Sequence, residues 1–210
     1  MMNFQRLGWV VAAAILGVFA ASGFQGSFQK VASVDLENLV ETSDLGKTNL
    51  AAFNATQTTY NQLLGFVDEN RVLTIDEAKK LRELWLKETP GAVDKASLES
   101  LKASIVAETK QNDLLSGKPN LTPEERIQLQ AFSSRSAQTE QLEAQWYQEF
   151  GQALQQSSLQ RKADTLTKAK AAAQSVAKAQ GYTLMFDASV APYAVNDLTP
   201  DALKAMNAQK

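Results

Sequence analysis

Hydrophobic residues recur at helical spacing through most of the chain after its first 46 residues. From Lys47 one apolar stripe predicts a first long helix, through Leu50, Phe53, Tyr60, Leu63, Leu64 and Phe66. The pattern breaks between Val67 and Thr74. Thr74 and Glu77 then form a capping box for a helix to about Glu88. A further amphipathic segment follows over about 92–115, between Pro90-Gly91 and Ser116-Gly117.

The longest predicted helix begins at Pro123. Thr122 is placed to cap it, Pro123 suits the first helical position, and Glu125 lies at the positive end of the helix dipole. Gly181 is the next strong stop signal. A continuous helix over 123–180 would be roughly 87 Å long, and Ser133–Ser136 is its weakest stretch. Its apolar stripe requires a partner, which we expect to be the outgoing helices folded back as a hairpin: Leu129, Phe132, Leu142, Trp146, Phe150 and Leu154.

The end of this helix carries two further patterns. Leu159, Leu166 and Ala173 recur at heptad spacing among alanines, which fits either the close approach of helices in an oligomer or plain helix propensity. Basic residues also gather here, opposed only by Asp164. They form either a solvated helix face or a patch that attracts acidic clients or lipid headgroups: Arg161, Lys162, Lys168, Lys170 and Lys178.

Strand patterns lie near both ends of the sequence. Residues 30–36 alternate, residues 182–187 form an apolar run, and residues 190–195 suit a second late strand. Thr199-Pro200-Asp201 then starts a terminal helix with Leu203 and Met206 facing inward. We expect the early strand to pair with the Leu184 strand. The predicted core of this body, which would also hold an oligomer together, is Val31, Val34, Leu36, Leu39, Leu184, Phe186, Val190 and Tyr193.

The predicted fold is therefore mainly α with a small β body formed by both chain ends, from which a long antiparallel helical hairpin projects as an arm. Residues 24–46 and 181–210 would form the body. Residues 47–180 would form the arm, with an irregular insert at about 67–118.

Residues 1–23 have the pattern of a targeting segment, with Arg6 followed by an uncharged apolar run and small residues. The segment is either a signal peptide cleaved near Gly23 or a retained membrane anchor, and both place the remainder outside the cytoplasm.

The amino-acid composition excludes most catalytic mechanisms. The 210-residue chain has no His and no Cys, which excludes Ser/His catalysis, thiol nucleophiles, disulfides and the usual transition-metal ligands. Gly46-Lys47-Thr48 imitates a phosphate-binding loop, but Glu41 stands where the leading glycine should be. The adjacent acids Asp68-Glu69 and Glu124-Glu125 are better explained by solvation and capping. We expect no enzyme activity, cofactor or metal. The formal net charge of −2 indicates no global electrostatic partner, and we expect no nucleic acid.

Two segments resemble the Skp/OmpH family of periplasmic chaperones. The head, KVASVDLENLVETSDLGKTNL, is similar to the family's short strand, acid, turn and Gly-Lys helix start. The tail, SVAKAQGYTLMFDASVAPYAVNDLTPDALKAMN, is similar to its closing helix end, strands and capped last helix. The resemblance implies a periplasmic homotrimer whose helical hairpins enclose a cavity. That cavity would hold unfolded outer-membrane proteins without ATP. The family's best-known members are strongly basic, and this chain departs from them in charge.

The main alternative is a membrane-anchored coiled-coil protein that links parts of the cell envelope and has no clients. A retained N-terminus would favour that reading, because an anchor must remain attached to the chain that it holds.

Overall fold

The computed structural model describes residues 30–191, 193 and 195–208. The predicted targeting segment at 1–23 lies outside the described residues. The described chain is 77% helical with one two-stranded sheet, which confirms a mainly α fold with a small β part. It divides into two units, which are described separately. Unit 1 comprises residues 30–39 and 168–208 of the described chain, and unit 2 comprises residues 40–167.

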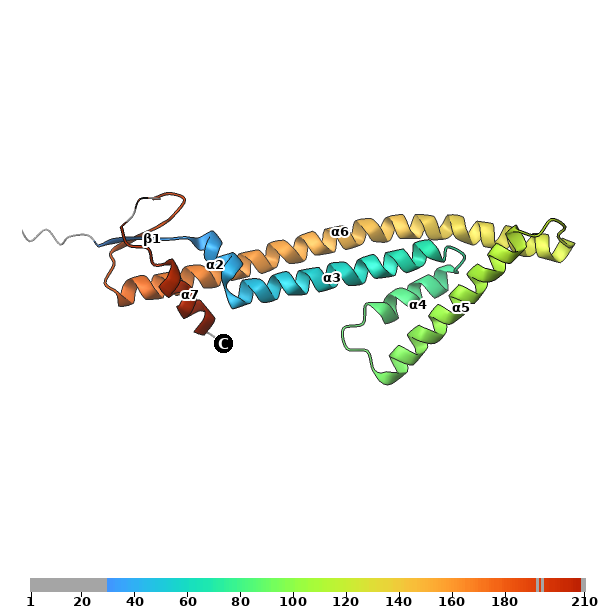
Figure 1. Ribbon diagram of the computed structural model, residues 1–210, viewed down its shortest axis with the longest axis horizontal. Coiled ribbons are helices and arrows are strands. Elements are labelled where there is room, and N and C mark those ends of the chain that lie inside the picture. The colour runs from blue at the N-terminus through green and yellow to red at the C-terminus, as the bar shows by residue number, and fades with distance from the viewer. Residues whose placement is uncertain (1–29, 192, 194, 209–210) are drawn as a thin grey trace, which may run out of the picture. The chain divides into compact units, whose positions relative to one another are not determined.

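Two strands and six helices make up the regular structure of the described residues (Figure 1). The strands are β1 (Val31–Val34) and β2 (Leu184–Asp187). The helices are α2 (Leu36–Thr42), α3 (Asp44–Glu69), α4 (Ile75–Trp85), α5 (Ala92–Ser116), α6 (Pro123–Ala179) and α7 (Thr199–Ala208).

Local capping determines where most helices begin. The Ser43 hydroxyl accepts a hydrogen bond from Gly46 N–H at the start of α3. Thr74 and Glu77 form the predicted capping box of α4. At the start of α6, Thr122 N–H donates to Glu125 and Glu125 N–H donates to Thr122 Oγ1. α6 runs through Ser133–Ser136 as one helix and ends before Gly181, whose φ of 74° suits a glycine C-cap. The start signals predicted for α4 and α6 and the stop signal at Gly181 are confirmed.

The helices predicted within the insert at about 67–118 are confirmed. Most of this segment is helical, because α3 continues to Glu69 and α4 and α5 occupy 75–85 and 92–116. Irregular backbone is confined to the connections at 70–74, 86–91 and beyond 116. The capping box and the apolar faces of α4 and α5 make them regular helices that pack against each other and against the rest of unit 2.

The core of unit 2 draws on all four of its long helical segments. Trp146 and Phe150 of α6 pack with residues of α3, α4 and α5, and the Tyr60 and Phe150 rings stack with centroids 4.1 Å apart. The buried members of this cluster are Leu63, Val67, Leu73, Ala78, Leu81, Ile105, Trp146 and Phe150. Thus α4 and α5 cover much of the α6 stripe, for which the sequence predicted the outgoing helices as partners.

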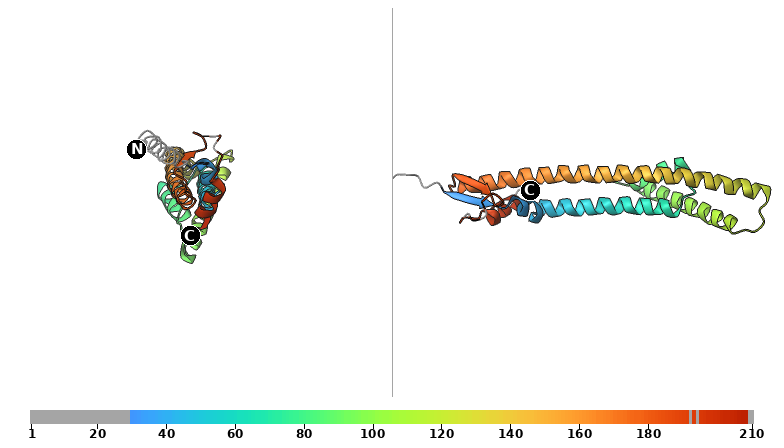
Figure 2. Two further views of the ribbon diagram at one scale, coloured as in Figure 1. Left: turned by 90° about the vertical axis from the view of Figure 1, so that its left-hand side faces the viewer. Right: turned by 90° about the horizontal axis from the view of Figure 1, so that it is seen from above.

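Polar contacts fix how the helices of unit 2 lie against α6. Arg82 of α4 forms an ion pair with Glu149 at 2.7 Å, and Arg135 of α6 forms one with Glu108 of α5 at 2.6 Å. Asn49 Nδ2 of α3 donates to Thr165 Oγ1 of α6 at 2.9 Å. Because Asn49 meets Thr165 whereas the later Tyr60 meets the earlier Phe150, α3 and α6 run antiparallel where they touch (Figures 1 and 2).

Two glycines of unit 2 are expected to respond oppositely to alanine. A Cβ at Gly46 would lie 1.9 Å from the Val40 carbonyl oxygen, whereas a Cβ at Gly151, inside α6, would meet nothing within 4 Å. We expect Gly151→Ala to raise the free energy of unfolding by about 0.5–1 kcal/mol, since alanine stabilises a helix interior relative to glycine. Gly46→Ala should lower it. Urea unfolding followed by circular dichroism would measure both, and a stabilised Gly46→Ala chain would contradict this packing.

Candidate functional site

The sheet joins the two ends of the described chain. β1 and β2 pair in parallel, with Val31 opposite Leu184 and Val34 opposite Asp187. The predicted pairing of the early strand with the Leu184 strand is confirmed. Parallel strands cannot be joined by a tight turn, so the connection between them must be a long crossover. Here residues 35–183 form that connection, and it contains all of unit 2.

β1 is the inner strand of this arrangement. On the edge away from β2, Ser33 N–H donates to the Asn196 carbonyl at 2.8 Å and Leu198 N–H donates to the Ser33 carbonyl at 2.9 Å. The Asn196 side chain also donates to the Val31 carbonyl at 2.9 Å. Residues 196–198 therefore satisfy the second edge of β1, and its residues Ala32, Ser33 and Val34 are buried.

β2, by contrast, has a strand neighbour on one edge only. The N–H groups of Leu184 and Ala188 donate to the carbonyls of Lys30 and Val34. Because successive peptide groups of a strand point to opposite edges, the N–H and C=O of Met185 point away from β1. In the described chain the sheet has the order β1-β2, and no third strand covers this edge. An open edge of this kind can accept another strand.

A small apolar cluster of unit 1 supports the sheet. Ala32 of β1 packs with Ala177 of α6 and with Leu198, and Tyr182 and Met185 lie against them. Lys30 Nζ donates to the Gln180 carbonyl at 2.8 Å and lies 4.3 Å from the centre of the Tyr182 ring. These contacts hold the start of β1 against the end of α6.

A chain of hydrogen bonds holds the end of β1 against the start of α7. Asp35 N–H donates to Thr199 Oγ1 at 2.8 Å, and that hydroxyl donates to Asp197 at 2.6 Å. The Asp35 carboxylate in turn accepts from Asn38 N–H at 2.8 Å and caps α2. The acid at the end of the first strand, which the sequence marked only as part of a turn, thus links three elements of unit 1.

Asp187 ends β2 and interacts with the turn that follows. Its carboxylate accepts hydrogen bonds from the hydroxyl and the N–H of Ser189, and these bonds lower the pKa of Asp187. A carboxyl group whose pKa is lower in the folded than in the unfolded chain stabilises the fold at pH values above its unfolded pKa of about 4. That contribution is lost as the pH falls toward the pKa of the folded state.

A pH series should reveal this contribution. We expect the unfolding free energy of the native chain to exceed that of Asp187→Asn at pH 7, and the difference to shrink as pH falls from about 5 to about 2. Comparing two chains at each pH cancels the titration of the other carboxylates. A difference that stays constant with pH would show that the Asp187 charge contributes nothing.

The predicted body-core residues fall into two groups. Val34 and Leu39 are buried, and Val31 and Leu36 are half-buried. Leu184 and Phe186 are 41% and 40% exposed, and they are alternate residues of β2. Val190 and Tyr193 are 73% and 94% exposed, so they are not in the core of a single chain. A role of the exposed residues in assembly stays a prediction.

The predicted strand over 190–195 is wrong for its described residues. Val190, Ala191, Tyr193 and Val195 have no strand structure. The Asp187 carbonyl accepts hydrogen bonds from the N–H groups of Val190 and Ala191, which closes a turn directly after β2. The segment that reaches β1 comes later, where Asp197 bridges Ser33.

Sequence reasoning also missed part of the core of unit 1, namely Ala32 and Leu198, which pack with Ala177. Leu198 did carry a signal, since it directly precedes the Thr199 helix start, where an apolar residue commonly packs against the first turns. Ala32 carried no signal, because alanine is common both on protein surfaces and in cores.

The described residues include no helix long and apolar enough to cross a membrane. In the same part of the chain, no group of three or more acidic side chains is arranged to hold a metal ion. Comparison with protein-family models, curated proteins and solved structures finds no match to this chain.

Proposed function

We propose that this protein is a periplasmic holdase chaperone of the Skp/OmpH type. It assembles through its sheet, as a homotrimer, and binds unfolded outer-membrane proteins between helical arms without ATP. The observation that carries the proposal is the parallel pairing of β1 with β2, because it makes one platform from both chain ends and inserts the whole helical segment between them.

The open edge of β2 supports assembly through this platform. Leu184 and Phe186 point to the same face of the strand, since side chains alternate along it, and both are about two-fifths exposed. An edge strand with exposed apolar side chains is a template for pairing with another chain. The occupant proposed here is a second copy of this protein, which would cover both the backbone edge and the apolar side chains.

The helices of unit 2 support the proposal of an arm. α3 and α6 run antiparallel at their contacts, and α4 and α5 complete the core near Trp146. Nearer their other ends, residues 44–60 of α3 and 151–164 of α6 have no buried side chain. Helix surface is therefore accessible there, and a holdase needs accessible surface to contact clients that have no defined shape.

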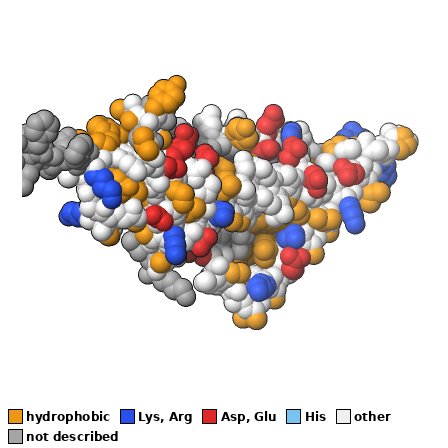
Figure 3. All heavy atoms as spheres, turned by 60° about the vertical axis from the view of Figure 1, so that its left-hand side comes forward, with side chains coloured by type: hydrophobic (Ala, Val, Ile, Leu, Met, Phe, Trp, Pro, Cys, Tyr) orange, Lys and Arg blue, Asp and Glu red, His pale blue; other side chains and the backbone are white. Residues whose placement is uncertain are grey.

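The proposed mechanism is physical rather than catalytic. Unfolded chains aggregate through exposed apolar segments, and many weak contacts inside a shielded space compete with that aggregation. Several arms acting on one client raise its apparent affinity without a specific pocket. We therefore expect no single residue to be indispensable for client binding, and charge to contribute little. On the face shown in Figure 3, acidic and basic side chains are interspersed.

The test combines two measurements on one preparation of the mature protein. Light scattering gives its mass in solution, and turbidity measures how far it suppresses aggregation of a urea-unfolded outer-membrane porin on dilution. We expect three copies per particle and suppression near one particle per porin. A monomer that leaves aggregation unchanged would refute the proposal. An assembled protein with an intact N-terminus and no suppression would favour the anchored structural alternative.

A further inference from the structure

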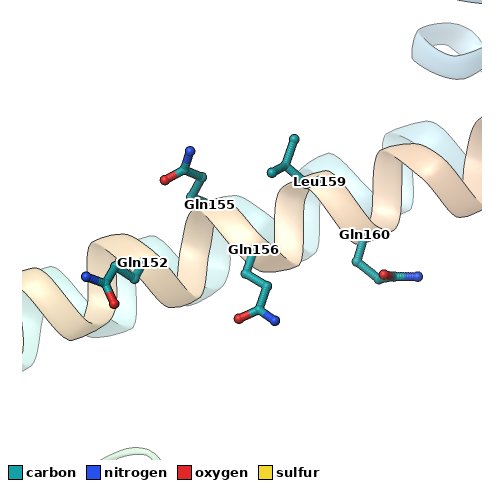
Figure 4. Close-up of a pocket in the computed structure, with 5 residues that line it drawn as sticks. All are labelled: Gln152, Gln155, Gln156, Leu159 and Gln160. Carbon is teal, nitrogen blue, oxygen red and sulfur yellow. The ribbon is translucent and has the colours of Figure 1, made fainter.

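An uncharged groove lies on α6, within unit 2 (Figure 4). Its volume is about 360 Å³, and it is lined by Gln152, Gln155, Gln156, Leu159 and Gln160. All five side chains are exposed, and Leu159 is 63% exposed although it is a large apolar residue. The groove falls in the part of α6 that has no buried side chain between 151 and 164. It is therefore open to a ligand.

The glutamines supply the same chemistry as a peptide backbone. A side-chain amide has a carbonyl acceptor and an N–H donor pair, so it can bind the N–H and C=O of another chain whatever that chain's sequence. Within the described chain, the side-chain amides of Gln152, Gln155 and Gln156 make no hydrogen bonds with other protein groups. Gln160 Nε2 donates to Asp164 at 3.0 Å, which leaves its carbonyl free to accept.

The spacing of three of these glutamines fits an extended chain. Gln152, Gln156 and Gln160 are four residues apart, so they form a row along α6 that rises about 6 Å per step. Peptide groups on one edge of an extended strand recur every two residues, or about 6.7 Å. The mismatch is under about 1 Å per step, which long side chains absorb. Leu159 also lines the groove, where its side chain points to the same side of α6 as Gln155, and it offers an apolar contact to a client side chain (Figure 4).

The lack of charge in the groove also favours the backbone of a polypeptide as its ligand. None of the five lining residues is charged, whereas Glu149, Arg161, Lys162 and Asp164 lie on either side of them in sequence. An uncharged groove has no electrostatic preference among acidic, basic and neutral segments, and its neutral amides match the neutral amides of a polypeptide backbone. Discrimination against folded proteins follows, because their backbone groups are already paired.

We propose that this groove binds the backbone of an unfolded client in an extended conformation, through the row Gln152, Gln156 and Gln160. The inference rests on the proposed holdase function and names the client-binding surface within it. In a strongly basic cavity, clients would be captured by charge. Here we expect them to be bound by hydrogen bonds that do not depend on the client's sequence.

The test compares two triple variants with the native chain, using a urea-unfolded, fluorescently labelled outer-membrane porin as the probe. The groove variant carries Gln152→Ala, Gln156→Ala and Gln160→Ala. The matched control carries Gln130→Ala, Gln138→Ala and Gln141→Ala, three exposed glutamines of the same helix outside the groove. We expect the groove variant to bind the porin about tenfold more weakly, from three modest hydrogen bonds, and the control to bind within about twofold of native.

Site-specific cross-linking provides a readout that does not depend on folding differences. A photo-reactive residue at position 156 should cross-link to the porin, and one at position 138 should do so much less. If the native protein suppresses porin aggregation but both variants bind alike and position 156 does not cross-link preferentially, the groove is not the client surface. If the native protein does not suppress aggregation at all, the proposed function itself fails.

The dependence of porin binding on ionic strength distinguishes binding through this groove from binding through charged residues. Binding through neutral amides should change less than about twofold between 50 mM and 500 mM salt, because screening acts on charged groups. A loss of tenfold or more over that range would assign capture to charged residues instead and overturn the proposal.

Discussion

A chain carrying Leu184→Asp and Phe186→Asp is expected to be monomeric. In the single chain both side chains are about two-fifths exposed on the open strand β2, so aspartate there should be tolerated by the folded monomer. In the proposed assembly the same positions become buried, and an unpaired carboxylate in an apolar interface costs several kcal/mol. We expect subunit association to weaken by at least about a hundredfold, and porin aggregation to proceed as it does without chaperone.

The control is a second double variant, Val93→Asp with Leu114→Asp. These residues of α5 are 80% and 76% exposed and belong to unit 2, whereas the sheet belongs to unit 1. That variant should keep the native mass and activity. Light scattering gives the mass of each chain, and circular dichroism confirms that each is helical. An assembled Leu184→Asp/Phe186→Asp protein would contradict a sheet-based interface.

Replacing Trp146 by alanine should produce the largest loss of stability in unit 2. The indole is 2% exposed in the main core cluster, and the Arg82 guanidinium lies 5.2 Å from the centre of its ring. Removing it takes away apolar burial, leaves a cavity and removes a partner of Arg82. We expect the free energy of unfolding to fall by about 3–5 kcal/mol, measured by urea titration.

Its neighbour provides the comparison. Tyr147 is 72% exposed, so Tyr147→Ala removes an aromatic side chain from the same helix without opening the core. The expected change is within about 0.5 kcal/mol. Equal effects of the two substitutions would show that the cluster around Trp146 does not hold unit 2 together.

Several features could be predicted because their cause lies within a few residues. Thr74 and Thr122 each lie where a side-chain oxygen accepts a hydrogen bond from an N–H group of the next turn, so they predict the starts of α4 and α6. Gly181 ends α6 for an equally local reason, since its positive φ favours a residue without a Cβ.

Longer-range predictions had mixed outcomes. The two strands were paired correctly because few other β-prone segments were available. The segment at 190–195 has strand propensity as well, but strand formation depends on a partner, and the Asp187 carbonyl accepts its N–H groups in a turn before it reaches β1. The apolar stripe of α6 required covering, yet its spacing did not show that α4 and α5 would supply much of the cover.

The sequence by itself determined the helical class, the bounds of its longest helix and the residues that cap its elements, because these depend on spacing and on hydrogen bonds across one turn. Only the tertiary structure decided which edge of the sheet stays open, that Asp35 links three elements, and that a row of glutamines remains uncovered on α6. Those features depend on which of several distant segments packs against a given helix face or strand edge. Tertiary packing decides this, and the spacing of residues within one element does not.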